Sequence, residues 1–302
     1  MRFIVRFFLL VLLLWAGFTV AAGLVLPDQL LKGPMPSRTE AQREHVRGTI
    51  SQNGSHWTMH AVPGGEGAPL EVWWLHRPQS KGVAIILHGF GDDAWGSSTR
   101  AHDLPDWDAV VFTFRGRDRH PEIPSTLGAW ERQDVVRVVG FLESQGLQRC
   151  TMLMAGTSMG AGVALLALAD LESSGLPLAG ALLESPYLDL RDAARNHIKG
   201  TLGGLEVLVW PAEQIAIHRA ARAAHFSADD VSPVKASVGL RTPIALLAGD
   251  ADAITPLAGV QRIARHHPDL TIVHDAGHCE AGGRVQGGWK SWADPRLSRW
   301  GF

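Results

Sequence analysis

Cysteines are scarce in this chain of 302 residues, which contains only Cys150 and Cys279. Cys150 opens an apolar run that predicts a strand, whereas Cys279 follows a histidine that we place at the opposite edge of the sheet. A strand of six residues spans about 20 Å, but a disulfide needs Cα atoms within about 7 Å of each other. We therefore expect two packed thiols and no disulfide. A Cys/His cluster with zinc-like spacing is also absent, and we expect neither a metal nor an organic cofactor.

Charge is sparse as well. Charged residues make up 19% of the chain, the net charge is −2, and no long basic run occurs. This argues against nucleic acid as a partner. Hydrophobic residues make up 46%, which excludes a disordered profile and suffices for a large core. The length favours one α/β domain preceded by an anchor or a tail.

The N-terminus has the composition of a membrane anchor or an export signal. Arg2 and Arg6 precede an uncharged stretch over 7–26, which is long enough to span a bilayer as a helix. Basic residues favour a cytoplasmic N-terminus, so the rest of the chain would lie on the outer, extracytoplasmic side. The small residues at 20–22 would suit a signal-peptide cleavage site and a secreted protein. Because the apolar run continues past them, we favour an uncleaved inner-membrane anchor over 1–26.

The remainder predicts a polar linker over 27–45 and one α/β domain over 46–302. Early apolar residues alternate as in antiparallel edge strands, whereas later runs are continuous, as in a parallel sheet covered on both faces. Strands are expected at 46–51, 56–62, 70–76, 82–88, 108–114, 150–156, 179–184, 242–248 and 270–274, and helices at 128–145, 161–170 and 257–266. The segment 187–238 predicts an insertion with helices near 189–199 and 205–224. It either packs on the domain or forms a small cap over the site.

The most informative motif is Gly-Thr-Ser-Met-Gly at 156–160. It follows an apolar run and precedes a predicted buried helix. Strand, Gly-x-Ser-x-Gly and helix form a nucleophile elbow, in which a sharp turn exposes the serine hydroxyl above the sheet. Gly156 and Gly160 would let neighbouring elements approach a strained turn. We therefore identify Ser158 as the candidate nucleophile.

A serine nucleophile needs an adjacent base that is itself oriented by a carboxylate. In chain order an acid and a histidine should follow the serine, each after a late strand. Asp252 and His278 meet this requirement, and we assign them as acid and base. Asp250 is the competing acid, but its place near the strand end suits loop capping. His274 is expected to pack or to form hydrogen bonds.

The charge that develops in such a reaction must be held by backbone amides. The sequence His-Gly-Phe-Gly at 88–91 follows a predicted strand, where a backbone N–H would be exposed. We assign the oxyanion hole to the amides of Phe90 and Met159, the latter directly after the nucleophile. His88 is expected to brace this loop.

Together the HGFG loop, the GTSMG elbow, the GDADAITP loop and the AGHCE loop resemble the α/β-hydrolase superfamily. With LLESPYLDLRDAA and ADDVSP they are similar to its membrane-anchored bacterial serine esterases and prolyl-oligopeptidase-like members. The resemblance covers about 46–280. It implies a mainly parallel, eight-stranded sheet with helices on both faces. It also implies the triad Ser158, Asp252 and His278 and the oxyanion hole named above.

Two segments depart from this resemblance. The tail after Glu280 is rich in Gly and Trp and lacks the expected amphipathic closing helix. Its Trp289, Trp292 and Trp300 are expected to pack over the sheet edge rather than to lie at a membrane interface. The basic stretch at 114–119 either attracts an anionic substrate or is solvated, and we favour solvation.

These features predict a serine hydrolase that cleaves small-molecule carboxylic esters through an acyl-enzyme. A peptidase or amidase, a thioesterase or an acyltransferase would use the same residues. A non-catalytic binding module held at the membrane is the alternative from another class. It would be expected to have lost a triad residue or an oxyanion-loop glycine, and this chain retains both.

Overall fold

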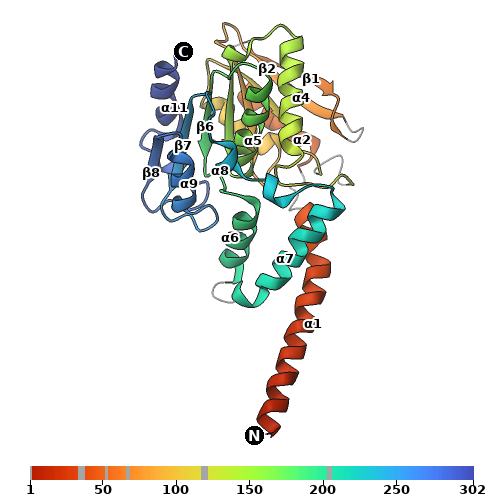
Figure 1. The fold of residues 1–302 in the computed structure, drawn as a ribbon. Coiled ribbons are helices and arrows are strands. Elements are labelled where there is room, and N and C mark those ends of the chain that lie inside the picture. The colour runs from red at the N-terminus through yellow and green to blue at the C-terminus, as the bar shows by residue number, and fades with distance from the viewer. Residues whose placement is uncertain (1, 33–37, 52–53, 66–68, 117–121, 203–205) are drawn as a thin grey trace.

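An eight-stranded sheet forms the centre of the molecule in a computed structural model (Figure 1). The structure describes residues 2–32, 38–51, 54–65, 69–116, 122–202 and 206–302. The strands, in chain order, are β1 (His56–Val62), β2 (Leu70–His76), β3 (Val83–Leu87), β4 (Asp108–Phe112), β5 (Met152–Thr157), β6 (Gly180–Glu184), β7 (Ile244–Gly249) and β8 (Asp269–Val273). Their spatial order is β1-β2-β4-β3-β5-β6-β7-β8.

The sheet has an antiparallel edge and a parallel remainder, as the alternation pattern predicted. Strand β2 pairs antiparallel with both β1 and β4, and every later pair is parallel. The chain has the α/β-hydrolase fold. Parallel pairing aligns the carboxyl ends of β5, β6, β7 and β8 along one edge. Loops from the second half of the chain therefore meet there.

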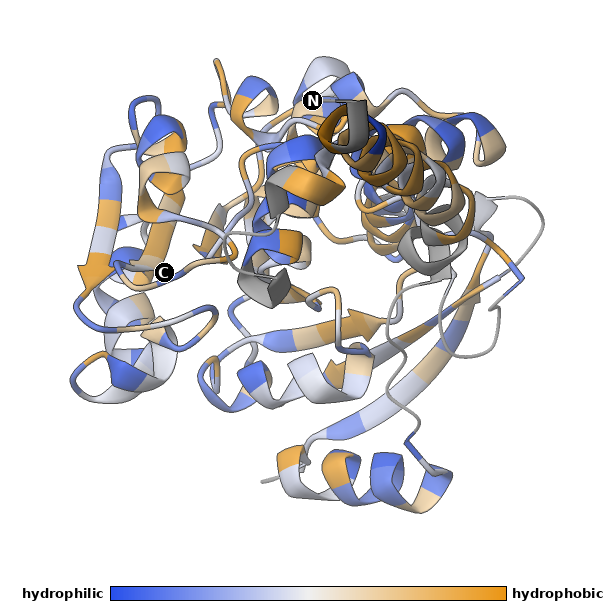
Figure 2. Cartoon of the chain, turned by 90° about the horizontal axis from the view of Figure 1, so that it is seen from below, coloured by the Kyte–Doolittle hydropathy of each residue, from blue (hydrophilic) through white to orange (hydrophobic). Residues whose placement is uncertain are grey.

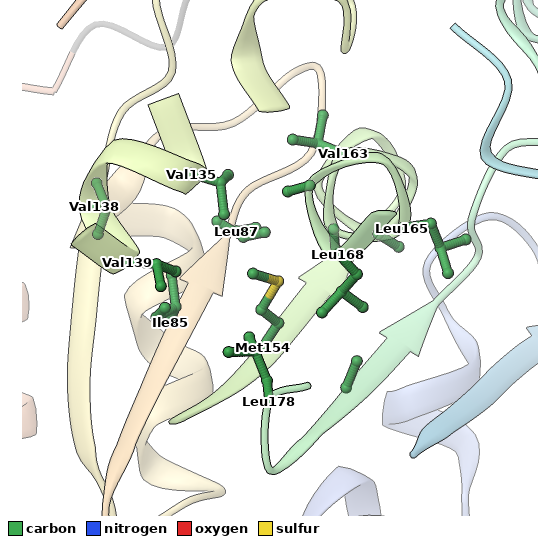
Figure 3. Packing of buried hydrophobic residues seen from close by; sticks show 14 of the residues in the cluster. Ile85, Leu87, Val135, Val138, Val139, Met154, Val163, Leu165, Leu168 and Leu178 are labelled. Carbon is green, nitrogen blue, oxygen red and sulfur yellow. The ribbon is translucent and has the colours of Figure 1, made fainter. Parts of the chain in front are cut away.

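Helices cover both faces of the sheet because each inner strand is apolar on both sides. Ile85 of β3 packs into one core cluster, while its neighbours Ala84 and Ile86 pack into the other. The first cluster is covered by α4 (Glu131–Ser144), α5 (Met159–Ser174) and α9 (Leu257–Ala264). Figure 3 shows side chains of α4 and α5 meeting those of β3 and β5 in this cluster. These two layers fix the positions of the strand ends.

A different set of helices covers the second cluster. These are α2 (Glu40–Ile50), α3 (Ala94–Ser97), α10 (Ala281–Arg284) and α11 (Gly288–Arg299). The sequence missed α11, which is the closing helix that the tail seemed to lack. Trp289 and Trp292 are buried in this cluster, so these two pack on the sheet as expected. The Gly-rich start of the tail and Pro295 obscured the helical pattern.

The strand expected at 46–51 is wrong, because these residues belong mainly to α2. Thr39 accepts a hydrogen bond from the Gln42 N–H, and the Gln42 side chain accepts one from the Thr39 N–H. This capping box starts a helix inside the predicted linker and carries it to Ile50. A short alternation of apolar residues could not reveal the effect of the cap.

Two helices form the insertion between β6 and β7. They are α6 (Leu190–Leu202) and α7 (Glu206–Ala223), close to the predicted ranges, and they are followed by the short α8 (Pro233–Ala236). Helices α6 and α7 leave the domain on the same side as the long N-terminal helix α1 (Arg2–Lys32), and α7 lies beside α1, as Figure 1 shows. One helix among the described residues is long and apolar enough to cross a membrane, over Ile4–Val25 with a mean hydropathy of 2.4.

Candidate active site

Ser158 occupies a sharp turn between β5 and α5. Its backbone has φ 53° and ψ −116°, a conformation that non-glycine residues rarely adopt. The Ser158 N–H donates to the carbonyl of Glu184 at the end of β6, and its own carbonyl accepts from Gly162 N–H in α5. Both anchors hold the turn, and the side chain is left partly exposed at the carboxyl edge of the sheet.

Glycines flank this turn because neighbouring backbone lies too close for a side chain. A Cβ added to Gly160 would lie 2.2 Å from the Leu87 carbonyl oxygen. A Cβ added to Gly156 would lie 2.7 Å from the Gly160 carbonyl oxygen. Neither approach is possible for real atoms. The two glycines of the motif therefore allow α5 to start directly against β3 and the loop after it.

The structure brings the three candidate catalytic residues together. Ser158 Oγ lies 2.8 Å from His278 Nε2. On the other side of the ring, His278 Nδ1 lies 2.9 Å from Asp252 Oδ2 and 3.1 Å from Oδ1. His278 therefore lies between a hydroxyl and a carboxylate, in the order expected from the sequence. The His278 side chain is 26% exposed, whereas that of Asp252 is only 1% exposed.

Local hydrogen bonds keep Asp252 charged. Burial acts to raise the pKa of this carboxyl, but hydrogen bonds from His278 and Thr255 outweigh it and hold the pKa below its ordinary value. Asp252 Oδ1 accepts from the N–H groups of Ile254 and Thr255, and Oδ2 accepts from the Thr255 hydroxyl at 2.7 Å. The carboxylate is thereby fixed in orientation beside the imidazole. Sequence reasoning had given Thr255 no role.

The alternative acid, Asp250, serves the adjacent loop. It accepts from the Asp275 N–H at 2.8 Å and contacts His274 Nδ1 at 2.7 Å. Both expectations for these residues are met: Asp250 caps a loop, and His274 forms a hydrogen bond. Neither contacts Ser158 in the described hydrogen bonds.

The loop after β3 lies directly beside Ser158. A Cβ added to Gly89 would lie 3.6 Å from Ser158 Cβ, so the backbone leading to Phe90 passes over the elbow. His88 is buried and braces this loop as expected. Its Nε2 accepts from the Phe114 N–H, so Nδ1 carries the proton and donates to the Gly89 carbonyl. Met159 begins α5, where the first amide groups have no acceptor within the helix.

Glu184 is a buried carboxylate near the site that the sequence analysis did not single out. It ends β6, is 1% exposed, and forms an ion pair with Arg100 at 3.1 Å. It also accepts from the Gly282 N–H at 2.7 Å, behind the loop that carries His278. Burial raises its pKa, opposed by Arg100 and Gly282. A charged residue that ends an otherwise apolar strand was the available signal.

Cys279 lies beside Ser158, and Cys150 lies at the surface. Both are free thiols. Burial, with the nearby Glu184 and Asp252 carboxylates, raises the pKa of the Cys279 thiol to about 12. The expectation of packed thiols is wrong for Cys150, which is exposed at the start of the turn before β5.

Arg115 corrects the expectation of a solvated basic stretch. Its guanidinium is buried and its Nε donates to Asp134 Oδ2 of α4 at 2.7 Å. Residues 117–119 of the stretch lie outside the described part of the chain. Among the residues that the structure describes, no group of His, Cys, Asp and Glu is arranged to hold a metal ion.

Solved structures share this arrangement of strands and helices over nearly the whole chain. An esterase of Pyrococcus furiosus has a TM-score of 0.64 at 18% identity, covering 90% of this chain and 98% of that chain. An esterase/lipase from an uncultured bacterium has a TM-score of 0.58 at 19% identity, covering 92% and 98%. An esterase of the bacterial hormone-sensitive lipase family has 0.58 at 18% identity, covering 88% and 91%. No family model and no curated protein matches the chain.

Proposed function

We propose that the protein is a serine hydrolase that cleaves carboxylic esters. The observation that carries this proposal is the continuous hydrogen-bonded series from Ser158 through His278 to Asp252. A hydroxyl, an imidazole and a buried carboxylate in this order constitute the machinery for acyl transfer. The similarity to solved structures that are named esterases adds independent support at the level of the fold.

In the proposed reaction, Ser158 Oγ attacks the ester carbonyl while His278 Nε2 takes the hydroxyl proton. Asp252 accepts the Nδ1 proton in a hydrogen bond, which keeps Nε2 free to act as base and stabilises the imidazolium. His278 then donates its proton to the leaving alcohol, and the acyl-enzyme forms. A water molecule, deprotonated by His278, attacks the acyl carbon and restores Ser158.

The negative charge on the carbonyl oxygen is assigned to the amides of Phe90 and Met159. Met159 N–H belongs to the first turn of α5, whose positive dipole end faces the site. The closeness of Gly89 to Ser158, where an added Cβ would lie 3.6 Å from the Ser158 Cβ, supports the choice of the next amide, that of Phe90. Each such donor is worth about 100- to 1000-fold in rate.

We further propose that α1 is an uncleaved anchor, with the catalytic domain on the extracytoplasmic side. Trp15, Thr19, Ala22 and Gly23 are the less exposed residues of its apolar segment, and they share one face. The Trp15 indole N–H donates to the Leu208 carbonyl of α7. Cleavage after Ala22 would remove most of this contact. A membrane-bound product with an intact N-terminus by mass spectrometry supports the anchor, and a soluble product that begins near residue 23 refutes it.

The activity is tested on the full chain in detergent with a fluorophosphonate probe. We expect a single covalent adduct at Ser158, mapped by mass spectrometry, which is lost in Ser158→Ala and His278→Ala. Parallel assays with p-nitrophenyl acetate, a peptide anilide and an acyl thioester then separate esterase from peptidase and thioesterase. A folded protein that neither reacts with the probe nor cleaves any of the three would be a binding module.

A further inference from the structure

Helix α7 lies against the N-terminal apolar helix and runs parallel to it. Trp15 of α1 donates to the Leu208 carbonyl near the start of α7. Eight residues later on α1, a Cβ added to Gly23 would lie 2.7 Å from Ile215 of α7. Close approach at a glycine is typical of helix pairs in membranes. The start of α7 is thus next to the middle of the apolar segment of α1.

The exposed side chains of α7 change character along the helix. Leu208 is 52% exposed and Trp210 is 48% exposed, and Ile215 is also exposed. After them His218 and Arg219 are exposed instead. On the adjacent α1, the apolar window ends at Val25 and is followed by Pro27 and Asp28. The change from apolar to polar therefore occurs at a similar level on both helices, which is the pattern expected at a membrane surface.

Most of α1 is exposed and apolar around its circumference. Its only buried or half-buried described side chains lie on the stripe that meets α7, and Ile4–Val25 is only 11% buried. Figure 2 views the molecule from the side on which α1 projects and shows its described turns coloured mainly as hydrophobic. If α1 spans the bilayer, α7 enters the bilayer with it. Trp15 lies ten positions before Val25, so Leu208, which contacts Trp15, would lie about 15 Å below the surface.

Basic side chains on α6 indicate that the α6–α7 hairpin enters the membrane only as far as the region near the lipid headgroups. The exposed side chains of α6 include Arg195, His197 and Lys199. Long basic side chains can extend to lipid phosphates while the helix lies lower. A hairpin with apolar residues exposed on one helix and basic residues on the other suits the boundary between acyl chains and headgroups.

The base of this hairpin is next to the nucleophile. Helix α6 follows β6, whose last residue, Glu184, accepts from the Ser158 N–H. Leu190 at the start of α6 packs with Tyr187 and Val231 in a cluster that also contains Ile217 of α7. Figure 1 shows α1, α6 and α7 leaving the domain on the same side. The carboxyl edge of the sheet, which carries Ser158, therefore faces the membrane.

We propose that the α6–α7 hairpin is inserted in the outer leaflet and that the site receives its ester substrates from the lipid phase. This rests on the esterase function proposed above, and it narrows the substrates to long-chain acyl esters held in a bilayer. Phospholipid of the leaflet would contact the exposed face of α7. We choose lipid rather than a second copy of the chain because this face is continuous with the apolar surface of α1.

Insertion is tested by site-directed spin labelling of the full chain, one copy per phosphatidylcholine nanodisc. Leu208→Cys and Leu176→Cys are each introduced with Cys150→Ser. Leu176 is the matched control, since it is also an exposed leucine (71%) but lies at the amino end of β6. We expect the label at 208 to be relaxed by oxygen and protected from a water-soluble nickel chelate, and the label at 176 to show the reverse. If the nickel chelate reaches the labels at 208 and 176 equally, the proposal is overturned. It is also overturned if the label at 208 is protected from the chelate only when two copies of the chain share one nanodisc.

The substrate preference is tested with Leu208→Glu/Trp210→Glu and, as control, Leu208→Phe/Trp210→Phe. We expect the glutamate variant to lose about tenfold or more of its rate on diacylglycerol carried in phosphatidylcholine vesicles, because the charges oppose insertion. Its rate on p-nitrophenyl acetate in water should stay unchanged, and the phenylalanine variant should retain both. An unaltered vesicle rate would contradict the proposal. If the wild type cleaves neither ester, the esterase function fails, while the labelling result still decides insertion.

Discussion

Ser158 illustrates how a single residue is kept in an unfavourable conformation. A positive φ costs a non-glycine residue about 1–2 kcal/mol, and the hydrogen bonds of its N–H and carbonyl maintain it. The side chain consequently stands at the edge of the sheet, where His278 reaches it. Asp252 and Glu184 provide two buried carboxylates near the histidine loop. Asp252 accepts from the N–H groups of Ile254 and Thr255, and Glu184 accepts from the Gly282 N–H.

At this scale, Asp252→Asn should lower kcat on p-nitrophenyl acetate about 10,000-fold, because the amide would favour the wrong tautomer of His278. The matched variant Asp250→Asn should retain most activity, since Asp250 serves only the loop that contains His274 and Asp275. Steady-state kinetics of both variants, with circular dichroism to confirm folding, decide the assignment. The reverse ranking of the two variants would make Asp250 the acid.

The two cysteines should differ sharply in reactivity. Cys150 is exposed, whereas burial raises the pKa of Cys279 to about 12, so its thiol stays protonated near neutral pH. Iodoacetamide at pH 8 should therefore modify Cys150 rapidly and modify Cys279 only after unfolding. Peptide mapping by mass spectrometry measures both rates. Fast modification of Cys279 in the folded protein would contradict the protonated state of its thiol.

At the scale of elements, packing at the elbow depends on how closely α5 meets β3. Gly160 has no room for a side chain, but Gly140 in α4 is open, with nothing within 4 Å of an added Cβ. An alanine substitution at Gly140 therefore measures only the helix preference of alanine, whereas the same substitution at Gly160 also measures steric overlap.

Gly160→Ala should destabilise the fold by about 3 kcal/mol and abolish activity, because either the elbow or the β3 loop must move. Gly140→Ala should instead stabilise it by about 0.5–1 kcal/mol, since alanine favours a helix interior. Urea unfolding of the two variants measures both effects. Similar stability of the two alanine variants would show that the elbow can relax.

The contact between α4 and the segment after β4 depends on a buried ion pair. Arg115 and Asp134 have almost no exposed surface, so removing either residue takes away charge compensation that the buried partner needs. Asp134→Ala should cost about 3–5 kcal/mol. Lys290→Ala, which breaks the exposed pair with Asp294, should cost about 0.5 kcal/mol or less. Thermal unfolding of both variants is the measurement, and equal costs would argue against the buried pair as a stabilising contact.

At the scale of the whole molecule, α1 is part of the tertiary structure as well as an apolar segment. It covers α7 through a stripe of small and aromatic residues. Ala212 and Ala216 of α7 are buried, and Gly23 contacts this helix. Removing α1 would expose that face of α7 to water.

A fragment over 38–302 should consequently self-associate in the absence of detergent and become monomeric when detergent is added. Light scattering coupled to size-exclusion chromatography measures this. The same fragment with Leu208, Trp210 and Ile215 changed to serine is the control and should associate less. A monomeric unaltered fragment in water would show that the contact with α1 is dispensable.

Apolar patterning predicted a mainly parallel sheet, the positions of its eight strands and the insertion helices, and motif spacing predicted the candidate residues Ser158, Asp252 and His278. The α/β-hydrolase fold was implied by the resemblance of the motifs to that superfamily. Each depends on local order along the chain: apolar runs, a Gly-x-Ser-x-Gly turn, and loops at strand ends. Patterning failed at 46–51 and at α11, where a capping box and tertiary packing override weak apolar periodicity.

Only the tertiary structure decided which distant groups meet. Glu184 and Gly282 are 98 residues apart, and Trp15 and Leu208 are 193 apart. The same holds for the burial of Arg115 against Asp134 and for the raised pKa of Cys279 beside Ser158. Such contacts carry no local signal, because partner, burial and distance are set by how sheet edges and helices pack.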